Sequence, residues 1–484
     1  MRSTFPVLAC SVLLAAASAS AQPSSAKADA LARVERQRAD LVGLSDRIWE
    51  LAETALREER SAAALAGHAE QQGFAVQRGV AGMPTAFVAS YGQGRPVIAI
   101  MAEYDALPGL SQKASTIKEP FAAGAAGHGC GHNLFGTASL GAAVAVKELI
   151  ANGTLKGTVR LLGTPAEESI GGKIYMIREG LFTDVDVVLA WHPLDETYAD
   201  YEGAQANVQF FVEFNGRTAH AAGDPWNGRS AADAIEAFTH GVNLLREHVK
   251  PSVRMHYTVQ KAGDVPNVVP DYARIFTWVR DSRRGGVDDV FARVKEIAQG
   301  AALVAGVEHT ITVQTGYSDM NILTRGLELL QSNLAALPAI AYTDEEQAAA
   351  RALQKATGKD EKGMSAALKP LAPIAKDPDG GSTDVGDVSW VVPTLHFYAA
   401  TAPIGVPWHA WPVVASSRMS IGHKGMMFAA QGLAATAVDL FEKPDVREAL
   451  RKQFDAQTKG IVYRWLVPDG PPPLPSKSGL AAGR

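Results

Sequence analysis

Short apolar runs that end in polar clusters alternate with helical patterns, and this alternation limits the fold more than any other feature. The runs are Val97 to Met101, Thr158 to Leu162 and Val185 to Ala190, and the helical patterns between them are Gly136 to Ile150 and Lys173 to Leu181. Apolar strands connected by helices indicate an α/β fold with a mostly parallel sheet covered by helices. Reactive side chains in such sheets collect beyond the carboxyl ends of the strands. The polar clusters all have that position, so the sequence predicts a functional site at this edge.

A different pattern begins after Gln205. It contains expected strands at Val208 to Phe214, Val253 to Gln260, Ala273 to Val279 and His309 to Thr315, and expected helices at Arg229 to Val249 and Val287 to Val304. The order β-α-β-β-α-β is that of a ferredoxin-like α+β domain. We therefore expect residues 206–317 to form an inserted domain, and residues 28–205 plus 318–460 to form the α/β domain.

The α/β pattern resumes after the insertion with a further strand at Thr394 to Ala400, which leads to the cluster Val406 to His409. A charged loop rich in proline and glycine, Gly358 to Gly381, precedes that strand. The proline-rich tail at 468–484 is predicted to be disordered.

The first residues resemble a secretory signal. A basic start is followed by an apolar run to Ala17 and by Ala19-Ser20-Ala21, which predicts a signal peptide at residues 1–21 and a periplasmic or secreted protein. The run is too short to span a bilayer, so no membrane association is expected. The net charge of −5 provides no basic footprint for nucleic acid. Cys10 would leave with the signal, so Cys130 would be the sole thiol.

Residues of the types that bind metals gather at the predicted sheet edge. They are Cys130 and His132 in the glycine-rich stretch Gly127 to Asn133, Glu167 and Glu168, His192, and His409. The stretch could be a glycine-rich turn that carries histidines by chance, but the convergence of a thiol, imidazoles and carboxylates favours a metal site. Even five ligands from these six residues exceed what one tetrahedral zinc takes, and they suit two metal ions that share a bridging group.

The neighbouring carboxylates Glu167 and Glu168 are expected to have different roles. Adjacent side chains of an extended segment point in opposite directions. One carboxylate can therefore bind metal while the other acts as a general base on a water molecule. A bound divalent ion lowers the pKa of its water molecule to about 7, so that the water can attack a carbonyl carbon at neutral pH. This is the chemistry that amide hydrolysis needs.

Several further motifs make the sequence recognisable. They are Met101 to Pro108, Gly127 to Asn133, Pro165 to Glu168, Ala190 to Pro193, Arg217 to Ala222, Pro266 to Asp271, Gly381 to Trp390 and Ile421 to Met426. Together they resemble the M20 family of metallopeptidases and amidohydrolases, in the Cys-Gly-His branch that includes aminoacylases, hippurate hydrolases and auxin-conjugate hydrolases.

The resemblance implies a role for each matching residue of the metal site. The implied ligands of two divalent metal ions, Zn²⁺ or Mn²⁺, are Cys130 as a bridging thiolate, His132, Glu168, His192 and His409. Glu167 is implied as the general base, and Asp105 as the carboxylate that orients a ligand.

The inserted domain would act as a lid and dimerisation unit. The resemblance implies that His220 reaches across a dimer interface to stabilise the oxyanion, and that Asn267 and Arg280 hold the substrate's carboxylate. The expected assembly is a homodimer, or a heterodimer with a related subunit.

This chain also departs from the family pattern. Asn133 stands where many relatives have an acidic residue after Cys-Gly-His, and Gly386-Asp387 replaces an acidic run. His423 is the alternative to His409 as last ligand, whereas His128 is not expected to bind metal. Asp384 and Asp387 are expected to cap or turn the chain.

Three functions follow as hypotheses. The first is hydrolysis of N-acyl or N-aroyl amino acids, with p-aminobenzoyl-glutamate as the first substrate to test. The second is a dipeptidase or general aminoacylase with the same chemistry. The third, of another class, is a subunit that is inactive without a partner chain.

Overall fold

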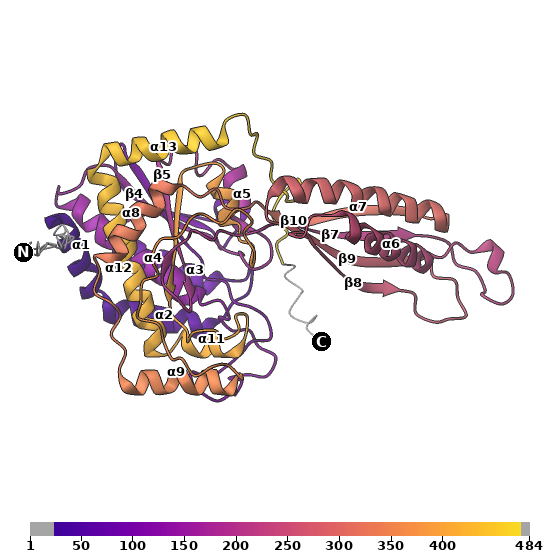
Figure 1. The fold of residues 1–484 in the computed structure, drawn as a ribbon, viewed down its shortest axis with the longest axis horizontal. Helices are drawn as coiled ribbons and strands as arrows, with labels where there is room; N and C mark the ends of the chain where they lie inside the picture. Colours follow the sequence, from indigo (N-terminus) through magenta and orange to yellow (C-terminus); the bar gives the residue numbers. More distant parts are fainter. Residues whose placement is uncertain (1–23, 476–484) are drawn as a thin grey trace, which may run out of the picture.

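A computed structural model describes residues 24–475 of the chain (Figure 1). It contains a seven-stranded sheet of order β1-β2-β4-β3-β5-β11-β6 and a four-stranded sheet of order β10-β7-β9-β8. This arrangement confirms the predicted fold class, a mostly parallel sheet with helices and a separate antiparallel α+β unit. The expected signal peptide lies outside the described residues.

The first sheet is parallel at its centre and antiparallel at its edges. Its strands are β1 (Ala75–Arg78), β2 (Phe87–Gly92), β3 (Val97–Ala102), β4 (Thr158–Gly163), β5 (Val187–Leu194), β6 (Tyr198–Ala199) and β11 (Thr394–Ala400). Strands β4, β3, β5 and β11 pair in parallel, while β1, β2 and β6 pair antiparallel. All residues of β3 are buried and apolar, as expected of a strand covered on both faces.

Helices surround this sheet. They are α1 (Ser25–Arg36), α2 (Arg38–Leu51), α3 (Glu59–Gln71), α4 (His132–Ala151), α5 (Gly172–Arg178), α8 (Thr324–Ala335), α9 (Asp344–Ala356), α10 (Val385–Ser389), α11 (Trp411–Ser416), α12 (Ser420–Glu442) and α13 (Pro444–Thr458). Small residues let the long helices approach the strand ends closely. A Cβ on Gly136 of α4 would lie 2.6 Å from the Glu103 carbonyl oxygen. Helix α4 is apolar and long enough to cross a membrane, but 78% of its most apolar window is buried inside the protein.

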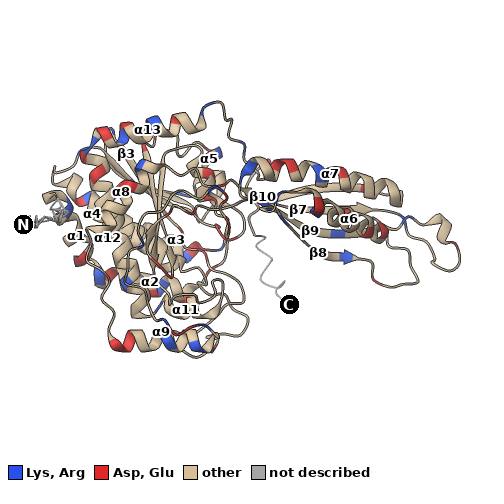
Figure 2. Ribbon diagram, viewed as in Figure 1, with Lys and Arg blue, Asp and Glu red and all other residues tan. Residues whose placement is uncertain are grey.

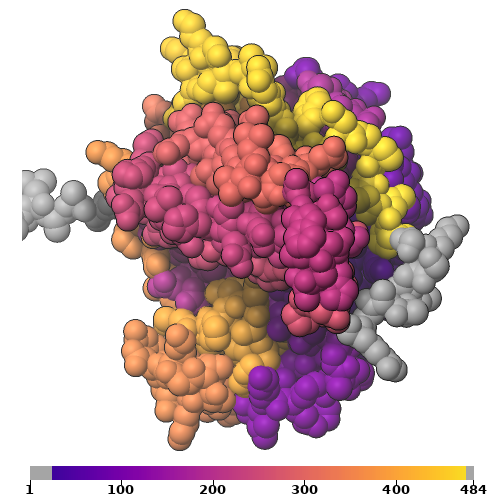
Figure 3. Space-filling view, turned by 90° about the vertical axis from the view of Figure 1, so that its right-hand side faces the viewer, coloured from indigo at the N-terminus to yellow at the C-terminus, as the bar shows by residue number. Residues whose placement is uncertain are grey.

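The second sheet has its own hydrophobic core. Its strands are β7 (Ala206–Asn215), β8 (Arg254–Ala262), β9 (Tyr272–Asp281) and β10 (Glu308–Tyr317), and its helices are α6 (Ala231–Leu245) and α7 (Arg284–Ala305). Alternate residues of β7, from Val208 to Phe214, pack in the core with both helices. This unit extends to one side of the first sheet (Figure 1), and Figure 3 looks at it end-on, with a hollow beneath it.

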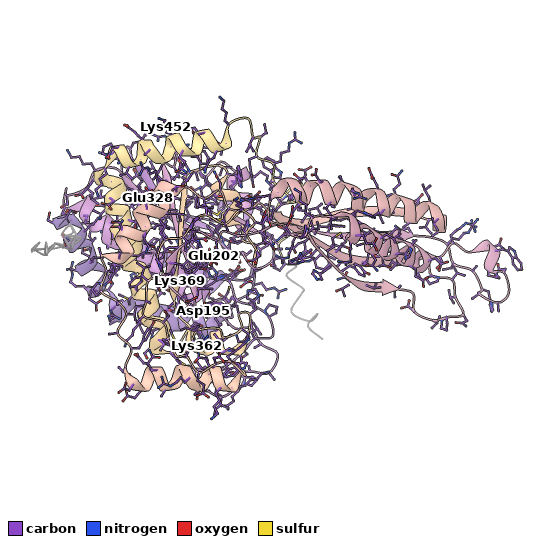
Figure 4. All side chains as sticks on the ribbon, viewed as in Figure 1. Asp195, Glu202, Glu328, Lys362, Lys369 and Lys452 are labelled. Atoms are coloured by element: carbon purple, nitrogen blue, oxygen red, sulfur yellow. The ribbon has the colours of Figure 1, made fainter. Side chains whose placement is uncertain are left out.

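The predicted proline- and glycine-rich loop partly covers the β6 edge of the first sheet. The Lys369 backbone N–H donates to the Thr197 carbonyl, and the Lys369 ammonium lies 4.9 Å from the centre of the Tyr198 ring. The Tyr198 hydroxyl donates to Glu202 at 3.0 Å. Lys369 and Glu202 are both labelled in Figure 4. The loop therefore protects a strand edge that would otherwise expose backbone groups.

The segment after α13 contacts both sheets. Leu466 packs against the core of the second sheet, and Val467 is buried in the core of the first. Arg178 of α5 donates to the carbonyl oxygens of Pro468 and Gly470. On the surface helices α13 and α7, basic and acidic residues are interspersed (Figure 2).

Candidate active site

The glycine-rich stretch places a thiol and an imidazole at the N-terminus of α4. Gly131 precedes the helix with a φ of +75°, a left-handed conformation that glycine adopts without strain. A side chain on Gly129 would collide with Leu110, 2.6 Å from its Cβ position. His132 is fully buried, and Cys130 is half-buried at the mouth of the turn. The glycines thus let the backbone turn where the two donors meet.

The carboxylates and His409 come from two loops at the same sheet edge, and His192 comes from the last part of β5. After β4 the chain turns at Ala166, which has a φ of +63° and whose N–H is held by Glu58 at 3.0 Å. This turn directs Glu167 and Glu168 towards α4. His409, in the loop after β11, also has a positive φ, of +52°, and its N–H donates to the Gly129 carbonyl.

The potential metal ligands form three overlapping groups, of which one consists of Glu103, His132 and Glu167 and the other two share one atom. Cys130, His132 and His192 each offer a ligand atom within 4.8 Å of the others, and so do Cys130, Glu168 and His409. The Cys130 sulfur belongs to both groups and lies 3.5 Å from His192 Nε2. The structure therefore brings together all five residues that the resemblance implied as ligands. A shared thiolate between two donor groups is the arrangement that a pair of cations needs.

The hydrogen bonds around the histidines fit metal binding. His132 Nδ1 donates to Asp105 at 2.9 Å, and His192 Nδ1 donates to the Pro193 carbonyl at 2.7 Å. In His192 this leaves Nε2 with its lone pair directed towards the Cys130 sulfur, whereas His132 Nε2 faces the Glu103 carboxylate, whose Oε2 lies 3.1 Å away. Among the described residues, Glu168 Oε1 is buried without a hydrogen-bond partner, and His132 Nε2 is buried with only the Glu103 carboxylate beside it and no well-formed hydrogen bond. Buried polar atoms without partners are rare, and a bound cation would satisfy both.

The electrostatics of the site also fit bound cations. Burial, together with the charges of Glu103 and Glu168, raises the pKa of Glu167 well above its usual range. Burial also raises the pKa of the Cys130 thiol and lowers that of His192. Crowded, desolvated anionic donors of this kind are unfavourable alone. Two divalent cations would neutralise them, so the residues present fit the group.

Asp105 connects two of the candidate ligands. Its Oδ1 accepts from His132, and its Oδ2 accepts the backbone N–H of Glu168 at 2.9 Å. One fully buried carboxylate therefore fixes the orientation of an imidazole and the position of the loop that carries Glu168.

A cavity of 410 Å³ opens beside the donors, and both sheets line it. From the first sheet and its loops come Cys130, Glu167, Glu168, His192, Tyr398, Trp408 and His409, and from the second sheet come Asn207, Gln209, Trp278, Arg280 and Tyr317. Arg280 donates to the Ser382 hydroxyl at 2.9 Å, and its guanidinium lies 4.6 Å from the centre of the Trp278 ring. The cavity thus joins a wall of potential metal ligands to a wall that carries the positive charge of Arg280.

The sequence matches the peptidase family M20/M25/M40 over residues 99–358. It is also 38% identical over 475 residues to one subunit of the p-aminobenzoyl-glutamate hydrolase of Escherichia coli (strain K12), a match that covers 92% of this chain and 98% of that protein. The chain belongs to the M20 family. The motifs predict this family and, within it, a likeness to that hydrolase, and the comparison confirms both. The protein is accordingly an M20 metallohydrolase that acts on amide bonds.

Other known proteins are similar to this chain in sequence or in fold. The Xaa-Arg dipeptidase of Mus musculus is 30% identical over 444 residues, with 88% of this chain and 92% of that protein covered. The fold is similar to a putative aminohydrolase from Staphylococcus aureus, with a TM-score of 0.66, 18% identity, and 86% of this chain and all of that chain covered. It is also similar to a dinuclear metal-binding M20 peptidase from Bacillus subtilis, with a TM-score of 0.57, 18% identity, and 84% and 99% coverage.

Two residues expected at the M20 active site lie elsewhere in this chain. His220 and Asn267 are exposed in neighbouring loops, where the Ala221 N–H donates to the Asn267 carbonyl, and neither lines the cavity. These loops follow β7 and precede β9, at the end of the second sheet opposite to Arg280 (Figure 1). Within one chain, only Arg280 of the three residues implied on this unit reaches the site.

The alternative residues are accounted for by other contacts. His423 Nε2 bonds Asp46 at 2.9 Å and belongs to neither donor group. His128 is buried and bonds the Ile48 carbonyl, as expected of a structural histidine. The expectation for Asp384 is wrong in one respect: it stands at the start of α10, but its side chain makes no cap and instead binds Lys173.

Sequence reasoning missed the polar residues of β7 that line the cavity, Asn207 and Gln209. The sequence does contain a pattern that predicts them: they alternate with the apolar residues Ala206, Val208 and Phe210, which face the helices, so Asn207 and Gln209 must face the other side of the sheet. It also missed the fully buried Lys173, which lies between Glu103 and Asp384.

Proposed function

We propose that this M20 enzyme hydrolyses the amide bond of N-acyl or N-aroyl amino acids, and that p-aminobenzoyl-glutamate is the first substrate to test. The observation that supports this most is the cavity that joins the two donor groups to Arg280. A substrate with a carboxylate near its scissile amide would place the carboxylate at Arg280 and the amide beside Glu167. The 38% identity to the p-aminobenzoyl-glutamate hydrolase chain of Escherichia coli is the reason for the choice of aroyl group.

Cys130, His132, Glu168, His192 and His409 would hold two divalent ions. When bound, these ions would supply an activated water and polarise the substrate carbonyl. Cys and His ligands favour Zn²⁺, while Mn²⁺ is the alternative suggested by the resemblance.

The protein's own groups would then carry the proton. The Glu167 carboxylate would take it from the attacking water and give it to the leaving amine nitrogen. Asp105 would keep His132 in the tautomer with a free Nε2. Arg280 would hold the substrate carboxylate, so that the scissile carbon stays beside Glu167.

A second chain would complete the site. His220 lies far from the cavity of its own chain, so its expected role on the oxyanion requires a partner, with residues 206–317 as the dimerising lid. The partner would be an identical copy or a related but different chain. The latter is suggested because the p-aminobenzoyl-glutamate hydrolase of Escherichia coli also has another, different subunit, which is 30% identical to this chain over 236 residues.

A substrate panel tests the proposal. Purified protein, treated with chelator and then loaded with Zn²⁺ or Mn²⁺, is assayed on p-aminobenzoyl-glutamate, acetyl-amino acids and dipeptides. Preference for p-aminobenzoyl-glutamate supports the proposal. Preference for dipeptides would favour the second candidate, a dipeptidase, which the identity to Xaa-Arg dipeptidase supports. Hydrolysis only after a second polypeptide is added would identify a dependent subunit, and activity in metal-free protein would reject the mechanism.

We also propose that residues 1–21 direct export and are removed. Protein recovered from an export-competent bacterial host should then begin at Gln22, as measured by intact mass. Recovery of the full-length chain in the cytoplasm would contradict this localisation.

A further inference from the structure

Asn207, at the start of β7, is a buried amide without hydrogen-bond partners. Its side chain is 1% exposed, and neither Nδ2 nor Oδ1 has a partner among the described residues. Because both atoms lack partners, the observation does not depend on which way the amide is oriented. Burial of an unsatisfied amide is unfavourable for folding. The residue also lines the cavity that contains Cys130 and Glu167. A ligand in the cavity is what would satisfy it.

The residues beside Asn207 indicate the kind of ligand. In the register of the second sheet, Asn207 is paired with Tyr317 of β10 on one side and with Arg280 of β9 on the other. All three line the cavity. One Arg280 nitrogen bonds Ser382, and Tyr317 donates its hydroxyl to the Glu167 carbonyl. Of these three neighbouring residues, Arg280 therefore keeps guanidinium N–H groups that can bind a ligand, and Asn207 keeps its whole side-chain amide.

A primary amide offers a donor and an acceptor on one planar carbon. An α-N-acyl amino acid presents the complementary pair, since its amide N–H and its carboxylate are attached to the same α-carbon. Asn207 Oδ1 can accept the substrate N–H while Nδ2 donates to one carboxylate oxygen, and Arg280 binds the other oxygen with full charge.

We propose that Asn207 is a specificity-determining residue that recognises the N–H and the α-carboxylate of an α-N-acyl amino acid together with Arg280. This inference rests on the proposed function. It predicts selection against esters, which lack the N–H, and against α-carboxamides, which lack the anionic oxygen.

The main test replaces Asn207 with leucine, which is of similar size and lacks polar atoms. Thr277→Val is the matched control, because Thr277 is also fully buried with an unpartnered hydroxyl, in β9, but does not line the cavity. Three probes are used: p-aminobenzoyl-glutamate, its α-carboxamide, and the ester in which oxygen replaces the scissile N–H.

With Asn207→Leu we expect kcat/KM for p-aminobenzoyl-glutamate to fall at least 100-fold, and for the ester, which lacks the N–H, to fall less than 10-fold. The α-carboxamide keeps the N–H and a carbonyl oxygen for Asn207, so its kcat/KM should fall by a factor similar to that of p-aminobenzoyl-glutamate. The control should stay within twofold of wild type on all three. The melting temperature of Asn207→Leu should equal or exceed that of wild type, because an unsatisfied buried amide is removed. Equal losses on p-aminobenzoyl-glutamate and the ester, no loss, or a melting temperature lowered by more than 5 °C would overturn the inference.

A binding measurement separates this inference from the proposed function. In a Glu167→Gln background, the Kd of p-aminobenzoyl-glutamate measured by calorimetry should rise at least tenfold when Asn207→Leu is added. It should also rise with the isosteric change Asn207→Asp, which places a negative charge beside the substrate carboxylate. If wild type cleaves no amide, the proposed function fails, whereas an unchanged Kd in both double variants overturns the role of Asn207 alone.

Discussion

Replacing Lys173 with methionine should destabilise this protein strongly. Lys173 is fully buried, and its ammonium donates to Glu103 and Asp384, each at 2.6 Å. Burial alone would lower the pKa of Lys173, but the charges of Asp384 and Glu103 outweigh it and raise the pKa, so the lysine is charged. The substitution leaves two buried carboxylates without their cation.

The expected loss is large because the pair is broken on one side only. An intact buried ion pair contributes little net stability, since desolvation offsets the attraction between the charges. Removal of one partner leaves an uncompensated charge and costs about 3–5 kcal/mol. Methionine is close to lysine in length, so the cavity contribution is small. We therefore expect the free energy of unfolding to fall by about 4 kcal/mol.

Urea unfolding of metal-free protein, followed by circular dichroism, measures this loss. Lys113→Met is the control, because Lys113 pairs with Glu119 at the surface, with side chains 46% and 54% exposed. Such a pair contributes about 0–1 kcal/mol. Adding Asp384→Leu to Lys173→Met should recover part of the loss, since it removes one stranded carboxylate.

A Lys173→Met variant whose free energy of unfolding lies within about 1 kcal/mol of the wild-type value, the range expected for an exposed ion pair, would refute this reasoning. It would also be refuted if Lys173→Met and Asp384→Leu gave strictly additive losses. Either result would mean that the three buried groups do not interact as charges.

Three further predictions concern other parts of the chain. Glu167→Gln should keep the metal content of wild type and lower kcat by about 10²-fold or more, measured by elemental analysis and steady-state kinetics. Burial raises the pKa of Asp439, but hydrogen bonds from Lys27, Lys443 and Asn333 outweigh it and lower the pKa below its usual value. Asp439→Asn should therefore reduce the free energy of unfolding at pH 7. This difference from wild type should disappear as the pH falls below about 4, where the wild-type carboxylate becomes protonated. Gly425→Ala should lower the free energy of unfolding by about 1–3 kcal/mol, measured by thermal unfolding, because the added Cβ would lie 2.2 Å from the Ala400 carbonyl oxygen. Gly300→Ala in α7 is the control. No described atom lies within 4 Å of its Cβ position, so this change should raise the free energy of unfolding by about 0.5–1 kcal/mol.

The sequence contained enough information for the central strands and the metal-binding donors. Fully apolar runs such as β3 and the first residues of β5, Val187 to Ala190, are stable in only one place, the covered centre of a sheet. The polar residues that follow them must then meet at one edge. For this reason Cys130, Glu168 and His192 could be predicted to converge although they lie far apart in the chain.

The edge strands escaped prediction for a physical reason. Strand β1 has only four residues and β6 only two, and both are held by antiparallel partners rather than by a pattern of their own. Similarly, the backbone of His409 has a positive φ, a conformation that histidine adopts more often than most residues but that the sequence does not predict at this position.

The length of strand β9 is enough to predict that Asn267 and Arg280 lie far apart. Strand β9 has ten residues, which at roughly 3.3 Å each separate its two ends by about 30 Å. Asn267 precedes the strand and Arg280 is near its end, so one substrate carboxylate cannot contact both within a chain. Residues matched to a family motif can therefore serve one site only if a second chain supplies some of them.

The central claim is that one thiol bridges two cations, and a metal analysis of the purified chain tests it most directly. After reconstitution with Zn²⁺ or Mn²⁺ and removal of excess metal, we predict two ions per chain for wild type and for the control His423→Ala. Cys130→Ser should retain at most one. A wild-type chain that binds one ion or none, or a Cys130→Ser variant that keeps two, would contradict the account.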